Sequence, residues 1–221
     1  MLYDFHTHSF LSDGVLSPVE LIRRAHVAGY AAVAVTDHAG PGNLELVLDQ
    51  LKRECALASR HWPIVAVPGV ELTHIPAASV DELARLARQA GAQLVVVHGE
   101  TVAEPVEPGT NRAAVDSEHV DVLAHPGLLS AEDAARAAAR GCFVEISGRK
   151  GHAFANGHVV RTGLAAGVAF LLDSDAHQPE ELLTESFALK VLRGAAVPES
   201  EIATILEANP RALLERVGQA G

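Results

Sequence analysis

The chain has 221 residues, of which 48% are hydrophobic, and its formal net charge is -11 with histidine counted as neutral. This length suits one substantial core, so we expect a single domain over residues 1–221. The acidic excess argues against a nucleic-acid partner, because binding through many phosphates needs clustered lysine and arginine. A small phosphorylated substrate remains compatible if metal ions supply positive charge locally. Nothing in the sequence indicates an oligomeric state.

Cysteine content and hydropathy bear on the disulfide content and the cellular location of the protein. Cys55 and Cys142 each lie in an apolar stretch, which favours core thiols over a disulfide framework or a cysteine-rich zinc site. The first residues run directly into a strand-like segment, and none of the apolar runs reaches membrane-spanning length. We therefore expect a cytoplasmic protein that makes no use of a membrane.

Short apolar runs alternate with helical patterns along almost the whole chain, which is the form of repeated βα units. The runs are continuous and do not alternate with polar residues, as expected for strands buried on both faces of a parallel sheet. We predict that this sheet closes, or nearly closes, into a barrel. The seven predicted strands are residues 2–5, 31–35, 64–67, 94–97, 120–124, 143–146 and 168–172.

Helix boundaries between the strands carry their own signals. Ser17, Ser79 and Ser130 each begin a capping pattern, with an acidic residue three positions later. A glycine follows several helical patterns just before the next apolar run, where a left-handed C-cap is needed. These are Gly29, Gly91, Gly141 and Gly167. After the last strand, residues 180–193, 199–207 and 210–217 are predicted helices that cover the barrel.

Polar residues follow nearly every predicted strand at its C-terminal edge, where barrel enzymes place their active sites. We expect their side chains to ring one mouth of the barrel. They are His6, His8, Asp37, His38, Glu71, His98, His125, Glu145, Asp173, Asp175 and His177.

The spacing of these residues points to metal binding. In an extended segment the i and i+2 side chains point the same way, so His6 and His8 can reach one cation, and Asp175 and His177 repeat this pattern. A single histidine at a strand end is more often structural. Many buried imidazoles and carboxylates together are costly unless a cation coordinates them. Their number exceeds the four or so ligands of one zinc ion, so we expect more than one ion, with Glu71 as a bridge.

The ordered set of motifs resembles the PHP family, named for its polymerase and histidinol phosphatase members. Each motif alone is unspecific, but the ordered set is specific and covers nearly the full chain. The motifs are His6-Thr7-His8 with Ser12-Asp13-Gly14, Thr36-Asp37-His38, Gly69-Val70-Glu71, His98, His125-Pro126-Gly127, Ser174-Asp175-Ala176-His177, and Asn209-Pro210 with Leu213-Leu214.

The resemblance implies an α/β fold, a distorted (β/α)7 TIM-like barrel, with a trinuclear site of divalent zinc, manganese or iron ions. Some relatives have histidine where Asp13 stands, so two to three ions are expected. Asp175 is the implied ligand, and Asp173 is assigned a structural or supporting role. The implied sets are His6, His8, Glu71 and Asp175 for one ion, Glu71, His98 and His125 for a second, and Asp13, His38 and His177 for a third.

The family's reaction implies a metal-dependent phosphoesterase, a phosphomonoester hydrolase similar to histidinol phosphatases. Glu71, His98 and His125 would hold the cations whose bridging hydroxide attacks the phosphate. None of the candidate residues specifically recognises the imidazole or the amine of histidinol phosphate, so a nucleotide or a sugar phosphate fits the same residues. The substrate class is therefore left open.

Substrate-side residues are predicted on two loops. The loop after the sixth strand carries Arg149, Lys150, His152 and His158, which could bind a phosphate or a carboxylate, or could be solvated. Further candidates after the fourth strand are Arg112 and Asn111, with Glu100 expected to orient His98. His74 is left unassigned. His26, His61 and His119 are assigned to structure or surface.

Three other functions are known for metal barrels or for this fold. A cyclic amide hydrolase commonly uses a carbamylated lysine as a bridge, and here none of the predicted strands ends in lysine. A non-catalytic RNA-associated scaffold of the same fold should have lost ligands and carry a basic surface. An exonuclease acting on the 3' ends of nucleotides or oligonucleotides would need stacking platforms, yet aromatic residues make up 4% of the chain.

Overall fold

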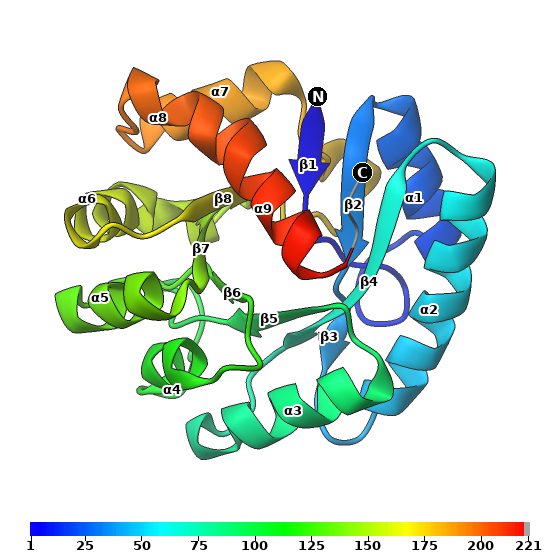
Figure 1. Cartoon of the computed structure of the whole chain (residues 1–221), viewed down its shortest axis with the longest axis horizontal. Helices are drawn as coiled ribbons and strands as arrows, with labels where there is room; N and C mark the ends of the chain where they lie inside the picture. The colour runs from blue at the N-terminus through cyan, green and yellow to red at the C-terminus, as the bar shows by residue number, and fades with distance from the viewer. Residues whose placement is uncertain (219–221) are drawn as a thin grey trace.

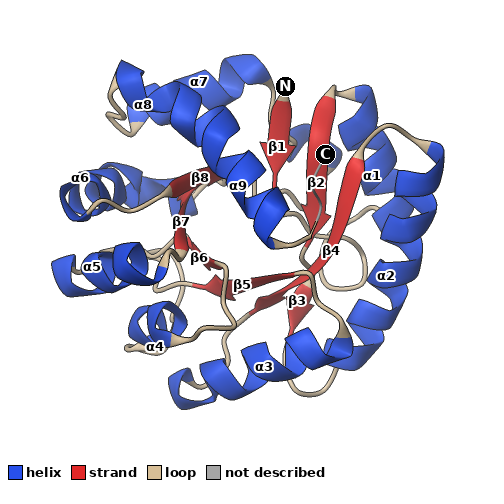
Figure 2. Ribbon diagram, viewed as in Figure 1, coloured by secondary structure: helices blue, strands red, loops and turns tan. Residues whose placement is uncertain are grey.

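Parallel strands form the centre of the structure, and they curve into a nearly closed barrel with helices around it (Figures 1 and 2). The computed structural model describes residues 1–218. The strand order is β1-β2-β4-β5-β6-β7-β8, and the short β3 pairs with β4. The strands are β1 Leu2–Asp4, β2 Tyr30–Val35, β3 His38–Ala39, β4 Val65–Leu72, β5 Leu94–His98, β6 Val122–Ala124, β7 Phe143–Ser147 and β8 Phe170–Asp173. The predicted barrel and its seven main strands are thus confirmed.

Strand β4 is longer than predicted because it changes neighbours midway. Its first half, up to Pro68, pairs with β2, and its second half, from Gly69, pairs with β5. A Cβ at Gly69 would lie 2.9 Å from the Leu94 carbonyl oxygen, so the close approach of β4 to β5 at this point requires glycine. The end of β4 also pairs with the unpredicted β3, which sets His38 opposite Glu71. Two predicted metal ligands are therefore placed by one backbone ladder.

Nine α-helices lie outside the sheet within residues 1–218. Ser17 and Ser130 cap two of them as predicted, because their hydroxyls accept hydrogen bonds from the amides of Glu20 and Asp133. Ser79 does not, because a 3-10 turn precedes its helix and leaves the residue without cap geometry. The helices are α1 Pro18–Val27, α2 Leu44–His61, α3 Val80–Ala90, α4 Thr110–Asp116, α5 Ala131–Arg140, α6 Asn156–Ala166, α7 Glu185–Gly194, α8 Glu199–Ala203 and α9 Asn209–Arg216.

The hydrophobic core has two parts, one inside the barrel and one between the sheet and its helices. Leu213 and Leu214 of α9 belong to the inner part, as does Tyr3 of β1. Figure 1 shows α9 lying across the strands, so the predicted C-terminal helices do pack on the barrel. Within residues 1–218, none of the helices is both long and apolar enough to cross a membrane.

Helix α6 approaches β8 very closely, which generates a stability prediction. A Cβ at Gly163 would lie 2.3 Å from Cζ of the buried Phe170 ring, whereas one at Gly157 of the same helix would meet its nearest atom at 3.9 Å. We expect Gly163→Ala to lower the free energy of unfolding by about 1–3 kcal/mol through overpacking. Gly157→Ala should be neutral or raise it by up to about 1 kcal/mol through helix propensity. Denaturant unfolding of both variants checks this, and equal values would contradict the close packing.

Candidate metal centre

The segment after β1 presents two imidazoles to the barrel interior. Thr7 turns the other way, because its hydroxyl donates to the Ala34 carbonyl at 2.6 Å and its backbone bridges to Ala176. His6 and His8 therefore point to the same side, with ring centroids 5.0 Å apart and both side chains fully buried. This is the arrangement that the i, i+2 spacing predicts.

Glu71 lies at the centre of the cluster and is fully buried at the end of β4. Its Oε1 lies 3.1 Å from His98 Nδ1, 3.3 Å from His6 Nε2 and 3.5 Å from His125 Nε2. Its Oε2 lies 2.6 Å from His38 Nδ1. Burial alone would raise the pKa of Glu71, but the surrounding imidazoles outweigh burial and hold this pKa well below its usual range. Glu71 is thus a buried carboxylate that contacts histidines from four segments.

Asp175 completes the inner part of the cluster from the loop after β8. Its Oδ1 lies 3.1 Å from His8 Nε2 and 3.8 Å from His6 Nε2, while its Oδ2 lies 3.7 Å from His125 Nε2. The residue has a left-handed backbone with φ of 53°, a strained conformation that turns its carboxylate inward. Asp175 therefore shares imidazole neighbours with Glu71, as expected for ligands of neighbouring cations.

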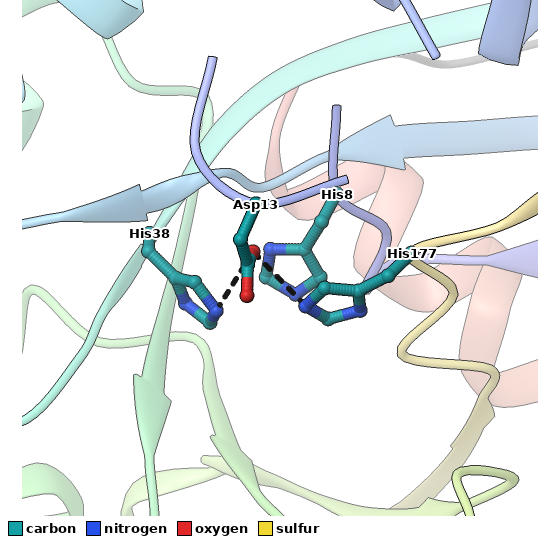
Figure 3. Close-up of side chains that lie close together, drawn as sticks. All are labelled: His8, Asp13, His38 and His177. Carbon is teal, nitrogen blue, oxygen red and sulfur yellow. Dashed lines mark ion pairs between the residues drawn. The ribbon is translucent and has the colours of Figure 1, made fainter. Parts of the chain in front are cut away.

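A second group lies toward solvent and is drawn in Figure 3. Oδ1 of Asp13 lies 3.3 Å from His38 Nε2 and 3.1 Å from His177 Nε2, and the His8 ring stacks on His177 at 4.1 Å. The two imidazoles hold the pKa of the Asp13 carboxyl well below its usual range, against the opposing effect of partial burial. The structure thus brings these three residues, which the resemblance assigns to a third ion, within reach of one cation.

The loop that carries Asp13 is fixed by Asp37. The Asp37 carboxylate accepts hydrogen bonds from the Ser9 amide at 2.8 Å, the Ser9 hydroxyl at 2.7 Å and the Ser12 hydroxyl at 2.6 Å. Gly14 lets this loop turn back on itself, because a Cβ there would lie 2.2 Å from the His8 carbonyl oxygen. Asp37, which follows β2, therefore positions the loop and does not belong to the groups of side chains that could share a cation.

Several buried nitrogens in the cluster have no hydrogen-bond partner among the described residues. They belong to His6, His8, His98 and His125. Leaving such atoms unpaired in a dry interior costs about 1–3 kcal/mol each. Imidazole nitrogens and carboxylate oxygens are the ligands that zinc, manganese and iron accept. The donor set therefore fits cations, and the unpaired nitrogens mark where they would bind.

Three further buried carboxylates, those of Glu145, Asp173 and Asp4, support the segments that carry the imidazoles. Oε2 of Glu145 lies 2.6 Å from His6 Nδ1, so this ring nitrogen donates to it and leaves His6 Nε2 for a cation. Asp173 accepts from the Phe5 amide at 2.6 Å, and Asp4 accepts from the Ser174 amide at 3.0 Å. Burial raises the pKa of Asp4 to about 7. Asp173 and Asp4 thus tie β1 to β8.

A cavity of about 250 Å³ opens onto the cluster. It is lined by Arg149 and His152, two of the predicted substrate residues. Thr73 and Glu104, which were not predicted from the sequence, also line it. Glu104 lies within a loop, where no strand-end pattern could single it out. The remaining lining residues are Asp13, His38, His74, His98, Asp175 and His177.

Two predicted substrate residues are not brought to this cavity. Arg112 on α4 turns toward α5, where its guanidinium pairs with Asp133 and lies 3.0 Å from Glu132. His158 lies on α6, and its Nε2 is 2.9 Å from the Leu129 carbonyl oxygen, to which it donates. Both side chains are engaged on neighbouring elements, which corrects their assignment as substrate residues.

Two further assignments change in detail. Lys150 lines a separate neighbouring cavity and not the one over the cluster. Glu100 does not orient His98, because its carboxylate accepts hydrogen bonds from the amides of Gly109 and Asn111 at 3.0 and 2.9 Å. The carboxylate that approaches His98 Nε2 from this loop comes from Glu104, at 3.1 Å.

Comparison with known proteins agrees with this geometry. The chain matches the PHP domain over residues 4–139, and it is 43% identical to an uncharacterised protein of Methanocaldococcus jannaschii across 98% of this chain and 100% of the relative. Its fold is similar to histidinol phosphate phosphatase from Lactococcus lactis, with a TM-score of 0.61 and 17% identity over 88% of this chain and 93% of that one. A solved structure from the metal-dependent tyrosine phosphatases YwqE from Bacillus subtilis and CpsB from Streptococcus pneumoniae is also similar. Its TM-score is 0.60, with 17% identity over 97% of this chain and 95% of that one. The chain therefore belongs to the PHP domain family.

Proposed function

We propose that this protein is a metal-dependent phosphoesterase that releases phosphate from a small phosphomonoester. The observation that carries the proposal is the convergence of unpaired buried imidazole nitrogens and carboxylates beside a cavity that also contains an arginine. Family membership supports the reaction class. The similar Lactococcus lactis enzyme was solved with zinc, L-histidinol and phosphate, which are a metal and products of a small phosphate ester.

The residues of the cluster would hold two to three divalent ions. The contacts around Glu71, Asp175 and Asp13 support the three ligand sets that the family resemblance implies. Bound cations would lower the pKa of a coordinated water and stabilise the negative charge that accumulates on the phosphate. The three sets are His6, His8, Glu71 and Asp175; Glu71, His98 and His125; and Asp13, His38 and His177.

Arg149 and His152 are the proposed substrate contacts. The Arg149 guanidinium donates to the Asp175 carbonyl oxygen at 2.8 Å and faces the cavity, where its planar fork suits phosphate oxygens. His152 Nδ1 and the Thr101 hydroxyl lie 2.7 Å apart, which fixes the ring and leaves Nε2 toward the cavity. Burial lowers the pKa of His152 to about 4, so its imidazole is neutral near pH 7 and can donate a hydrogen bond.

The size of the cavity favours a small substrate over a nucleic-acid strand. About 250 Å³ lies just below the range of about 300–1,000 Å³ that is typical of small-molecule sites. The net charge of -11 also disfavours a long polyanion. A nuclease and a non-catalytic scaffold are therefore the outcomes against which the proposal is tested.

We expect the purified protein to contain more than one equivalent of transition metal and to release phosphate from a panel of phosphomonoesters. His125→Ala removes a buried ring close to both Glu71 and Asp175, and should lower kcat/KM at least about a hundredfold, in line with the loss of groups that orient a metal. His61→Ala, at an exposed position of α2, is the matched control and should behave as wild type. Metal analysis and phosphate release measure both effects.

Other outcomes separate the alternatives. Faster release of mononucleotides from oligonucleotides than of phosphate from monoesters would favour the nuclease. A protein that binds no metal and gains no activity with zinc, manganese or iron would be the scaffold, and the proposed reaction would then be wrong.

Chelation should also lower thermal stability, because cations bind the assembled cluster and not the unfolded chain. One cation at a hundredfold its Kd stabilises by about 2.7 kcal/mol, which corresponds to a Tm change of roughly 5–10 °C for a chain of this size. We expect a decrease of at least this size when the metal-loaded protein is treated with a chelator, and a much smaller one for His125→Ala. Differential scanning calorimetry provides the measurement, and an unchanged Tm in wild type would contradict cation binding by the fold.

A further inference from the structure

The two ring nitrogens of His98 have different surroundings. Nδ1 lies 3.1 Å from Glu71 Oε1 with hydrogen-bond geometry, so this nitrogen donates its proton toward the inner cluster. Nε2 points toward the mouth, where it lies 3.1 Å from Glu104 Oε2. The side chain is buried, with 3% of His98 exposed, and Nε2 has no hydrogen-bond partner among the described residues. The nitrogen that carries a lone pair is thus the outward one.

The contact between His98 and Glu104 has the length of a hydrogen bond without its direction. Two atoms that coordinate the same cation also lie about 3 Å apart, because each is about 2.0–2.2 Å from the metal and the ligands are separated by a wide angle. In that case the lone pair of the nitrogen points at the cation and not at the oxygen. The position of Glu104 beside His98 Nε2 matches this second arrangement.

A third donor approaches from another loop. His74 Nε2 lies 3.1 Å from the same Oε2 atom of Glu104, and the His74 and His98 ring centroids are 4.8 Å apart. The two loops are joined, because the Ala77 amide donates to Glu107 Oε2 at 3.1 Å. Glu104 and His74 are therefore held next to His98 by the fold itself.

We propose that His74, His98 and Glu104 form an additional divalent-cation site at the outer edge of the cluster, beyond the ions that the family resemblance implies. The donor set of two imidazoles and one carboxylate suits zinc or manganese. The His74 and Glu104 side chains are 42% and 39% exposed, so water or a substrate oxygen can complete the coordination. This site faces the same cavity as the proposed reaction, and the inference rests on that function because it shares His98 with the inner cluster. A neutral imidazole has one lone pair, so His98 would serve both an inner and an outer ion as an imidazolate, whose Nδ1 proton is released to water when the metals bind.

The experiment measures zinc stoichiometry by equilibrium dialysis and elemental analysis of the full chain. His74→Asn and Glu104→Gln each remove one donor while the fold is retained, since asparagine tolerates the left-handed backbone of His74, whose φ is 50°. His61→Asn is the matched control. We expect both variants to bind one zinc equivalent fewer than wild type, or to bind the weakest zinc at least about tenfold less tightly. The control should bind as wild type does.

Each other outcome overturns the inference. Equal stoichiometry and equal Kd in wild type and both variants would show that Glu104 only accepts hydrogen bonds. Loss of every zinc equivalent would place these residues in the inner cluster. Failure of the proposed function is seen separately in the phosphate-release assay, where wild type would release no phosphate or His125→Ala would release it as fast as wild type does. Thermal unfolding of the metal-free proteins confirms that the variants fold as His61→Asn does.

Discussion

The rest of the structure depends on one buried charge, the carboxylate of Glu71. A carboxylate with no exposed surface is costly unless positive charge surrounds it, and here histidines from four segments supply that charge or the ligands of a cation. The crossing of β4 from β2 to β5 brings Glu71 to the centre of the mouth, and β3 sets His38 beside it. The barrel thus positions imidazoles from four segments around the Glu71 carboxylate.

Supporting residues restrict the side-chain and loop motions of the cluster. Glu145 fixes the ring of His6, Asp37 fixes the loop of Asp13, and Thr101 fixes the ring of His152. Each acts through a short hydrogen bond to a side chain or amide that would otherwise rotate. Such groups place metal ligands before a cation arrives, which lowers the entropy lost on binding.

Most of the barrel and its ring of polar residues could be predicted from the sequence, because buried parallel strands have continuous apolar runs and end in a common edge. Strand β3 could not, since two residues carry no periodicity. Glu104 was missed because it lies within a loop, far from a strand end. Arg112 and His158 were misassigned because the sequence places them near the mouth without telling which way their helices turn them.

The meeting of the first and last strands has a consequence for how the protein folds. Thr7 bridges to Ala176, and Asp4 and Asp173 join the same two strands, so the cluster draws its ligands from the first and the last strand of the barrel. Contacts of such long sequence separation form late and slow the folding rate, because a large loop must close first. A nascent chain still lacking its last strand would hold His6 and His8 without Asp175. The full set of ligands therefore arises only after the segment that follows β8 has been synthesised and has met β1.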